Sequence, residues 1–421
     1  MDKLFSEILT RRLDGEGPLG VAVSGGGDSL ALLYRLAEWG RRPLHVFCVD
    51  HGINPASAGW TEVVADHARR TGADFTALAW TGAKPATGMS AAARAARHAL
   101  LADAARKAGV RVLCLAHTFD DRLEAAWMRE QGSNVTLPAE WGPSPAWPQG
   151  RGIFLLRPLL GHRRTSLRDE LKARGIAWID DPANANPQSL RVQARLAEKA
   201  PPTQTATATL LPEQMEALLD REWAQLGLIA LRRPVFDDLP PALAHKVLAA
   251  AAVCAGGGMR LPRGDSVEAL AIGLASGRPR TLCGARLWQA DGHIRVVREP
   301  GDIVRAGTDR MMLASGDETM WDGRYAIRSE RSGAVESSRT ARGRLSEADR
   351  AVLVGLPAAL RGILPVLDDN FPNPALPSTR LLGQTTQTGV DFVNWVVPRF
   401  VAACGTVDRE SRIGLDLARP G

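Results

Sequence analysis

The stretch Val21-Ala-Val-Ser-Gly-Gly-Gly-Asp-Ser-Leu30 decides the fold of the amino-terminal part of this chain. An apolar run enters a glycine-rich turn, and a helical pattern begins directly after that turn. Backbone N–H groups of such a turn, at the positive end of a helix, form a cradle for an anion. We therefore predict a phosphate site made of Ser24, Gly25, Gly26, Gly27, Asp28 and Ser29.

The acidic residue in this turn distinguishes it from the usual nucleotide loop. The GxxxxGK[ST] motif places a lysine before its final hydroxyl residue, and here Asp28 stands in that place, followed by Ser29. An acid repels phosphate unless a cation lies between them, so Asp28 is predicted to bind a phosphate-bound Mg²⁺. The structural alternative is a glycine turn in which these two residues only start a helix. Three glycines, two serines and an acid between a strand and a helix favour the functional interpretation.

The first 180 residues alternate short apolar segments with longer amphipathic ones. This alternation predicts an α/β fold, a Rossmann-like parallel sheet with helices on both faces. The expected strands are 20–23, 44–49, 75–79, 110–116 and 153–156. The expected helices are 30–39, 61–70, 90–108 and 165–174. Residues 132–152, rich in proline and glycine, are expected to form a loop.

Three separate segments are expected to meet at one edge of this sheet. Ligands of parallel sheets bind beyond the carboxyl ends of the strands. Asp50 and His51 follow the second expected strand and His117 follows the fourth, on the same edge as the glycine turn. We therefore predict that these three residues and the glycine turn lie in one crevice, while a structural role for His51 stays open.

Residues 120–124 carry a pair of carboxylates. If Asp120 begins a helix, Asp121 and Glu124 lie three residues apart on one face. Two carboxylates on one face suit a cationic substrate, and a carboxylate can accept a proton from an amine. Acidic residues also stabilise a helix amino terminus, which explains Asp120 better than it explains the pair.

Two arginines, Arg94 and Arg97, share one face of the expected helix 90–108. Planar guanidinium groups bind carboxylates or phosphates through paired hydrogen bonds. An isolated pair of surface arginines would need no function, but the neighbouring motifs favour a binding role for Arg97.

At 421 residues the chain is expected to hold two or three domains. The proline- and threonine-rich stretch 199–209 resembles a linker. Residues 280–300 predict two strands joined at Asp291-Gly292, residues 321–328 are strand-like, and 345–354 are helical. We predict a nucleotide domain at 1–200, then smaller helical and α+β carboxyl-terminal domains at 201–300 and 301–421.

With 45% hydrophobic and 23% charged residues, the composition is that of a globular protein. The charged amino terminus lacks the apolar region of a signal peptide, so we expect a cytoplasmic protein with no membrane partner.

The five cysteines form no CxxC pair, which disfavours a zinc site and a disulfide framework. The net charge of +6 favours a polyanionic partner such as nucleic acid. Nothing in the sequence indicates the oligomeric state.

Residues 24–29 resemble the SGGxDS loop of the N-type ATP pyrophosphatases, the PP-loop superfamily. This resemblance leaves open thiolating enzymes, amide synthetases and tRNA(Ile)-lysidine synthetases. Residues 50–52, with Ser57 downstream, look like a nucleotide-bordering segment of the lysidine synthetases. Residues 115–125 resemble that family's AHHxDDQAET signature. The departures from it are Thr118, Arg122 and Ala125.

Further segments resemble the same family. Residues 92–98 are similar to its AARxxRY helix, and residues 157–160 match its RPLL element. Residues 178–184, which include Asp181 and Asn184, resemble WxxDxSN, and Arg191 with Arg195 stand in an eroded RNRIR element. Residues 280–300 resemble a region of lysidine synthetases outside the ATP domain. The resemblance to tRNA(Ile)-lysidine synthetases thus spans residues 19 to about 300. It implies that residues 1–200 form a PP-loop ATP pyrophosphatase domain and residues 201–300 a central domain that binds the tRNA substrate.

The resemblance implies a two-step reaction with ATP, L-lysine and the tRNA(Ile) that carries a CAU anticodon. ATP activates the C2 oxygen of the wobble cytidine as an adenylate and pyrophosphate leaves; the ε-amine of lysine then displaces AMP. Catalytic roles follow for Asp28, Asp121 and Glu124, and lysine binding for Arg97, Asp121 and Glu124. Two alternatives stay open: a tRNA-thiolating enzyme, whose usual cysteine pairs are missing here, and a catalytically silent RNA-binding homologue.

Overall fold

The computed structural model describes residues 2–53, 57–82, 84–133, 135–180, 190–197, 209–368 and 390–414. Contacts within the chain separate two compact units. Unit 1 comprises Met1–Ala206 together with Val407–Ile413, and unit 2 comprises Thr207–Thr406 with Gly414–Gly421. Most of the expected linker, and the residues Asp181 and Asn184, lie outside the described residues.

Unit 1 contains a six-stranded sheet in the order β3-β2-β1-β4-β6-β5. All neighbouring strands are parallel except β5, which pairs antiparallel with β6. The strands are β1 (Leu19–Ala22), β2 (Leu44–Asp50), β3 (Asp74–Ala79), β4 (Val112–Cys114), β5 (Trp141–Pro143) and β6 (Phe154–Leu156). The predicted parallel sheet is confirmed, and β5 is an addition inside the segment predicted to be a loop.

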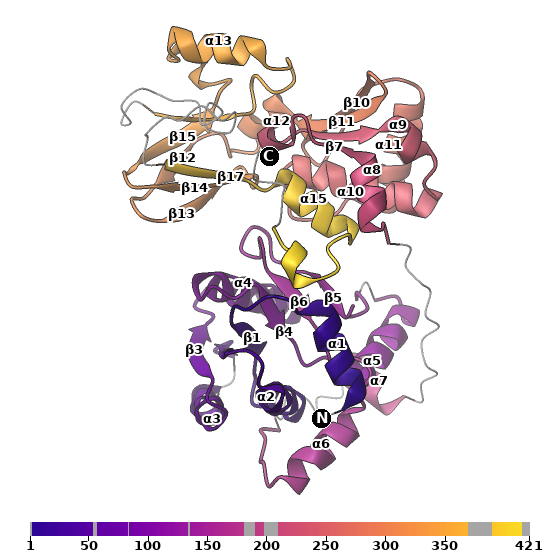
Figure 1. Cartoon of the computed structure of the whole chain (residues 1–421), viewed down its shortest axis with the longest axis vertical. Coiled ribbons are helices and arrows are strands. Elements are labelled where there is room, and N and C mark those ends of the chain that lie inside the picture. The colour runs from indigo at the N-terminus through magenta and orange to yellow at the C-terminus, as the bar shows by residue number, and fades with distance from the viewer. Residues whose placement is uncertain are drawn as a thin grey trace. The chain divides into compact units, whose positions relative to one another are not determined.

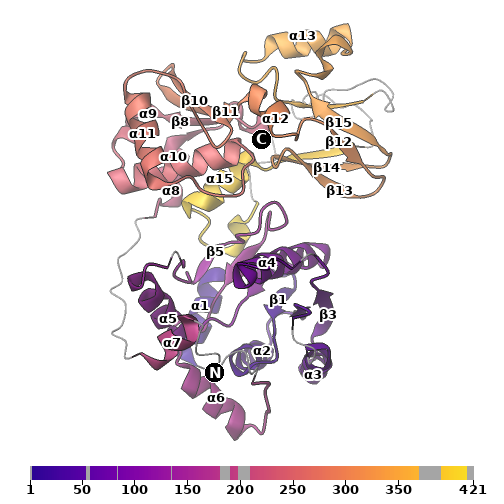
Figure 2. The same ribbon diagram turned by 180° about the vertical axis from the view of Figure 1, so that it is seen from behind.

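Seven described helices accompany this sheet. They are α1 (Lys3–Arg12), α2 (Gly27–Trp39), α3 (Ser57–Arg70), α4 (Met89–Lys107), α5 (Phe119–Glu130), α6 (Arg164–Ala173) and α7 (Leu190–Leu196). Helices α1 and α4 lie on opposite faces of the sheet, as the two views in Figures 1 and 2 show. The predicted arrangement with helices on both faces is therefore confirmed.

Apolar side chains from strands and helices hold these layers together. Under α4, Leu101 and Ala105 pack with Leu113 of β4 in one buried cluster. Burying a leucine side chain stabilises the fold by roughly 1.5–3 kcal/mol, so each layer depends on such contacts. The chain order reverses between β1 and β4, where connections leave in opposite directions and open a crevice at the carboxyl ends of the strands.

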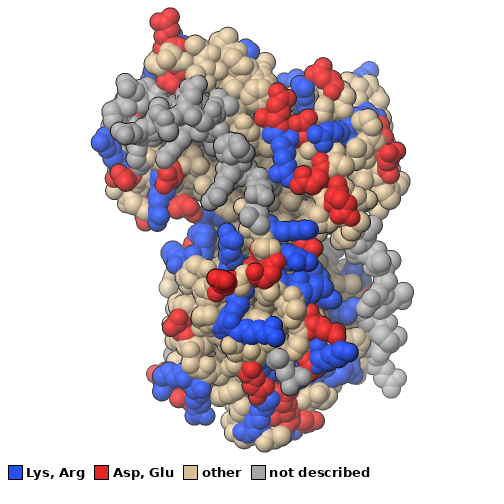
Figure 3. All heavy atoms as spheres, viewed as in Figure 1, with Lys and Arg blue, Asp and Glu red and all other residues tan. Residues whose placement is uncertain are grey.

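A short segment from the far end of the chain completes unit 1. This return segment, Val407–Ile413, is yellow in Figure 1 and lies against the connections that precede β1 and β2. The carboxylate of Glu410 forms a bidentate ion pair with Arg42, and the two side chains are 4% and 5% exposed. Further hydrogen bonds run from Arg12 Nη1 to Asp408 O (2.7 Å), from Trp141 Nε1 to Val407 O (2.7 Å) and from Ser411 N to Asp14 Oδ1 (2.7 Å). On the face of unit 1 seen in Figure 3, basic and acidic side chains accordingly lie next to one another.

Unit 2 contains a five-stranded antiparallel sheet, β7-β8-β11-β10-β9, and two three-stranded sheets, β12-β15-β16 and β13-β14-β17. The strands are β7 (Leu219–Asp220), β8 (Ile229–Arg232), β9 (Arg280–Leu282), β10 (Ala285–Ala290), β11 (His293–Arg298), β12 (Met311–Leu313), β13 (Glu318–Trp321), β14 (Tyr325–Ser329), β15 (Gly333–Ser337), β16 (Pro365–Leu367) and β17 (Val390–Asn394). The helices are α8 (Pro212–Leu218), α9 (Arg233–Asp237), α10 (Pro241–Ala255), α11 (Gly264–Ala275), α12 (Pro300–Arg305), α13 (Glu347–Gly355) and α15 (Val396–Cys404).

Two buried clusters form the core of unit 2, one mainly from residues 210–296 with 396–404 and the other mainly from 297–390. The division into domains at residues 200 and 300 stays a prediction.

Two Asp-Gly pairs set the hairpins of unit 2. Asp291 and Gly292 have φ values of 50° and 72° and join β10 to β11, as predicted. Residues 321–328, expected to be strand-like, belong to two strands: Trp321 ends β13, and residues 325–328 lie in β14. Asp322 and Gly323, with φ values of 48° and 63°, turn the chain between β13 and β14, because this dipeptide favours positive φ. Within the described part of the chain, no helix has both the length and the apolar character needed to span a bilayer.

Candidate functional site

The glycine loop has the geometry of an open anion cradle. It connects the end of β1 to Gly27, the first residue of α2, and no side chain caps that helix. Gly25 has φ = +83°, and a Cβ at this position would lie 2.5 Å from Cδ1 of Ile179. The Ile179 N–H also donates to Gly25 O at 2.9 Å. The loop therefore requires glycine here. The N–H groups of Gly27 and Asp28 begin α2, at the end of a helix that favours an anion.

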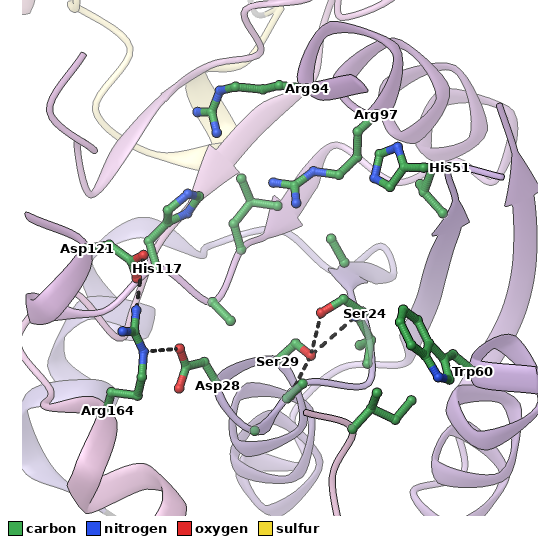
Figure 4. Close-up of a pocket in the computed structure, with 18 of the residues that line it drawn as sticks. Ser24, Asp28, Ser29, His51, Trp60, Arg94, Arg97, His117, Asp121 and Arg164 are labelled. Atoms are coloured by element: carbon green, nitrogen blue, oxygen red, sulfur yellow. Dashed lines mark hydrogen bonds and ion pairs between the residues drawn. The ribbon is translucent and has the colours of Figure 1, made fainter. Parts of the chain in front are cut away.

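The two serines of the loop hold its shape from inside. Ser29 Oγ donates to Gly26 O (2.8 Å) and accepts from Ser24 N (3.2 Å). The two hydroxyl oxygens lie 3.4 Å apart, with Ser24 nearer the cavity centre in Figure 4. Ser29 is therefore engaged within the loop, whereas Ser24 retains capacity for a ligand.

A cavity of about 580 Å³ lies at the crevice between β1 and β4. The glycine loop lines it together with His51 after β2, His117 after β4, and arginines of α4, α6 and α7. The predicted meeting of three separate segments at the carboxyl edge is therefore confirmed. Figure 4 shows Arg97 pointing toward the cavity centre from α4, while Asp28, Asp121 and Arg164 gather on another side.

The predicted site residues divide into two groups. Those that line the cavity are Ser24, Gly26, Gly27, Asp28, Ser29, His51, Arg97, His117 and Asp121. Gly25, Asp50 and Glu124 are not among the lining residues. Asp50 Oδ1 accepts from Gly52 N at 2.7 Å and shapes the turn after β2. Glu124 is 1% exposed, whereas Asp121, on the same helix, lines the cavity.

Arg164 joins the three carboxylates that were predicted to be catalytic, and sequence reasoning missed it. Its Nε donates to Asp28 Oδ2 at 2.9 Å, its Nη1 to Glu124 Oε1 at 2.9 Å, and its Nη2 to Asp121 Oδ1 at 3.3 Å. Burial lowers the pKa of Arg164, but the attraction of Asp121, Asp28 and Glu124 is stronger and the net shift is upward. The one available signal was that three buried acids need a cation, which no spacing rule locates.

Asp121 caps its own helix with one carboxylate oxygen and pairs with Arg164 through the other. Helix α5 begins at Phe119, one residue before the predicted start, and Thr118 caps it. Asp121 Oδ2 accepts from Thr118 N (2.8 Å) and Oγ1 (2.9 Å), which completes a capping box. Burial raises the pKa of Asp121, but Arg164 and the Thr118 N–H outweigh it and leave the pKa lowered, so the carboxylate is ionised at neutral pH. The Thr118 departure from the family signature therefore serves the helix cap.

The pKa of Asp28 is raised, in contrast to the lowered pKa of Asp121. Burial raises the pKa of Asp28, and the attraction of Arg164 only partly opposes that rise. Its Oδ1 is buried and has no hydrogen-bond partner among the described residues. An unsatisfied buried carboxylate oxygen beside an anion cradle indicates that a cation or donor belongs there when substrate binds.

Glu124 lies among three guanidinium groups. Besides Arg164, it pairs with Arg195 Nε at 3.0 Å and with Arg191 Nε at 3.4 Å. Both arginines come from α7, and both line the cavity. Glu124 therefore docks α7 against α5 and orients two cavity arginines.

The α4 side of the cavity is positively charged without compensation. Burial, followed by repulsion from Arg94 and Arg191, lowers the pKa of Arg97 to about 10, so it stays charged at neutral pH. Within the described residues neither Arg94 nor Arg97 forms an ion pair with a carboxylate. Two neighbouring guanidinium groups that line the cavity without an ion-pair partner in the described structure indicate an anionic ligand on this side.

The two predicted histidines are neutral. His117 Nδ1 accepts from Arg157 Nε at 3.2 Å, and burial together with Arg157 lowers the pKa of His117 to about 3. Burial and Arg97 also lower the pKa of His51, whose ring meets Trp80 edge-on at 6.4 Å. Neither side chain adds positive charge to the cavity at neutral pH.

The residues suit a magnesium ion that arrives with a nucleotide, not a preformed metal cage. Among the described residues, no group of three or more His, Cys, Asp or Glu side chains has the geometry to hold a metal. Mg²⁺ is commonly held by one or two carboxylates together with substrate phosphates and water. The unpartnered Oδ1 of Asp28 beside the glycine loop fits that pattern.

The fold, the glycine loop and a family-model match to residues 2–198 define the amino-terminal unit as a PP-loop domain, a class that uses ATP. A tRNA(Ile)-lysidine synthase from Caulobacter vibrioides is 41% identical over 415 residues, covering 96% of this chain and 97% of the relative. Those from Hyphomonas neptunium and Rhizobium meliloti are 35% and 33% identical and cover 70% and 81% of this chain, and 87% and 79% of their own. The chain belongs to the tRNA(Ile)-lysidine synthase family.

Proposed function

We propose that this enzyme joins L-lysine to C2 of the wobble cytidine in the tRNA(Ile) with a CAU anticodon, with release of AMP and pyrophosphate. One observation carries the proposal. A single cavity combines a glycine loop for phosphate, uncompensated arginines on α4, and an ionised carboxylate, Asp121, on another side. A reaction between a nucleotide and a cationic amino acid needs these three features together.

In the first step the glycine loop receives the pyrophosphate that leaves ATP. The N–H groups at the start of α2 and the Ser24 hydroxyl stabilise its negative charge. Asp28 Oδ1 is the atom that would hold Mg²⁺, which supplies further charge neutralisation when bound. His51 and His117 border the nucleotide as neutral groups, and Asp50 keeps the turn beside it in shape.

In the second step the ε-amine of lysine lies near Asp121. The ionised carboxylate attracts the ammonium group and then accepts a proton, so that the amine attacks as a neutral nucleophile. Arg97 binds the lysine carboxylate from the opposite side of the cavity. Glu124 contributes to lysine binding indirectly, because it orients Arg191 and Arg195, which line the cavity.

The deciding experiment follows pyrophosphate release by the full chain with purified tRNA, ATP and lysine. Incorporation of labelled lysine into the tRNA, dependent on ATP, is the expected result. Pyrophosphate release without any incorporation of lysine would indicate a thiolating enzyme, and tRNA binding without any release would indicate a silent homologue. Thiolation is disfavoured because burial raises the pKa of Cys48 to about 11 and that of Cys114 to about 12.

Replacing Asp121 by asparagine should raise the KM for lysine. Loss of a charge-assisted hydrogen bond costs roughly 1.5–3 kcal/mol, or about 10- to 150-fold in lysine use, while the amide oxygen preserves the cap on Thr118. Loss of the proton acceptor would appear in kcat instead, and either change fits the role. Glu130→Gln, an exposed acid at the end of the same helix, is the control. Unchanged lysine kinetics with weakened ATP binding would assign Asp121 to the nucleotide.

Exposed arginines of unit 2 that lack an ion-pair partner in the described part of the chain support the proposed tRNA binding. Five of them lie exposed on α11, its flanking turns and the edge of the sheet, and none forms an ion pair among the described residues: Arg260, Arg263, Arg278, Arg280 and Arg286. Arg286 lies over the Trp288 ring at 5.8 Å, an arrangement that also suits stacking with a base. We infer that this surface contacts backbone phosphates.

Changing Arg260, Arg263 and Arg278 together to glutamine should weaken tRNA binding. Each phosphate contact contributes about 0.7–0.9 to the slope of log K against log salt, so the slope should fall by about 2. A matched triple variant removes arginines that already pair with carboxylates, namely Arg233, Arg295 and Arg305. If both triple variants lose affinity and slope equally, general charge and not this surface governs binding.

A further inference from the structure

The guanidinium of Arg164 contacts carboxylates from two different elements that face one cavity. Asp28 belongs to the first turn of α2, beside the glycine loop, whereas Asp121 and Glu124 belong to α5. Three nitrogens of one side chain reach one oxygen each, at 2.9, 3.3 and 2.9 Å respectively. Figure 4 shows Arg164 placed between Asp28 and Asp121, with both contacts drawn.

Arg164 is itself held firmly. It is the first residue of α6, and its backbone N–H donates to Asp120 Oδ2 at 2.7 Å. Its side chain is 17% exposed, and α6 packs against α2. The guanidinium position is thus set by the helix framework and not by a loop.

Three carboxylates this close repel one another in a low-dielectric site unless a cation joins them. A planar guanidinium presents several donors in fixed directions, so it both neutralises the acids and sets their separation. A lysine ammonium, which is a point charge on a flexible stem, does not fix three partners in this way.

We propose that Arg164 is a positioning residue that fixes Asp28, on the nucleotide side, relative to Asp121, on the amine side, and so links the two steps of the reaction. This inference rests on the proposed function. The competing view is that Arg164 only occupies the place of the substrate ammonium and leaves when lysine binds. The two views predict opposite effects when Arg164 is removed.

The test compares Arg164→Ala and Arg164→Lys with Arg163→Ala in the full chain. Misplacing a reacting group by about 1 Å can cost about 100-fold, so Arg164→Ala should lower kcat by about that factor with a lysine KM within a few-fold of wild type. Arg164→Lys should fall between it and wild type. Arg163 is 54% exposed and pairs with Asp120, which is not one of the three carboxylates, so its loss should change kcat less than about twofold.

Chemical rescue by free guanidinium ion distinguishes a positioning role of Arg164 from a merely structural one. Added to Arg164→Ala, it should restore part of kcat, and it should not stimulate wild type or Arg163→Ala. A double-mutant cycle with Asp28→Ala should be non-additive, because each of the two changes removes the same contact between Arg164 and Asp28. A lower lysine KM in Arg164→Ala, an unchanged kcat, or additive losses without rescue would overturn the proposal.

Hydrogen exchange keeps this result separate from that of the proposed function. In Arg164→Ala, amides in the first turns of α2 and α5 should both exchange faster than in wild type, and in Arg163→Ala neither should change. If wild type incorporates no lysine but this paired loosening occurs, the proposed function fails while the positioning role holds. If wild type is active and the two turns are unaffected in Arg164→Ala, the positioning role fails.

Discussion

Replacing Asp28 by alanine should abolish ATP turnover and leave tRNA binding nearly intact. Asp28 is the only acid in the glycine loop, and its Oδ1 is buried without a hydrogen-bond partner in the described structure. Losing one group that stabilises charge in a transition state costs about 10²–10³-fold in kcat. The Asn variant keeps the shape and the contact with Arg164 but not the charge, so it should lose nearly as much.

The measurement is pyrophosphate release per enzyme with saturating tRNA and lysine, alongside a tRNA binding titration. Asp66→Ala is the matched control, since Asp66 is an acid on α3 that pairs with its helix neighbours Arg69 and Arg70. Near-wild-type turnover in Asp28→Ala would remove Asp28 from the proposed metal site. Equal losses of turnover and of tRNA affinity would point to a general structural defect instead.

Replacing Glu410 by alanine should destabilise unit 1 by about 3–5 kcal/mol, because it leaves the buried Arg42 without its counter-charge. The Glu410 carboxylate also accepts from Gly15 N at 3.2 Å, so the variant loses an anchor of the connection before β1. Arg42 keeps contacts with the Gly17 carbonyl, which do not neutralise it.

Because the chain has two compact units, these units need not unfold in a single transition. Exchange protection of amides in α1 and β1, measured under increasing urea, reports on unit 1 alone. Asp408→Ala is the control, since that side chain is 39% exposed and pairs with Arg409 and Arg412 within the segment. A Glu410→Ala protein as protected in unit 1 as the control would show that the return segment contributes little to stability.

Local signals in the sequence were sufficient for the sheet and the loop. Strands β1 and β2 are nearly continuous apolar runs, and the glycine turn follows β1 directly, so both could be predicted. Strand β5 could not, because it is three residues long, contains Pro143 and exists only through pairing with β6 at the sheet edge. The Asp322-Gly323 turn was available as a hairpin signal, and the strand-like pattern around it obscured it.

Only part of the site could be predicted from the sequence, because the remaining residues are placed by long-range packing. Strand ends locate Asp28, His51 and His117 by topology alone. The place of Arg164 depends on how α6 packs against α2, and the burial of Glu124 depends on α7 docking beside α5. Such contacts join residues about 40 to 140 positions apart, and no local rule ties those positions together.

The return segment also bears on how the polypeptide is made. Unit 1 starts at the amino terminus, but Val407–Ile413 is synthesised only after about 200 further residues of unit 2. At about 5–20 residues per second, ribosomes need roughly 10–40 s for that distance. Throughout this interval Arg42 lacks its carboxylate partner, so a nascent chain carries an incomplete nucleotide domain. The contacts of the return segment with Gly15 and Arg42 form only after unit 2 has been translated.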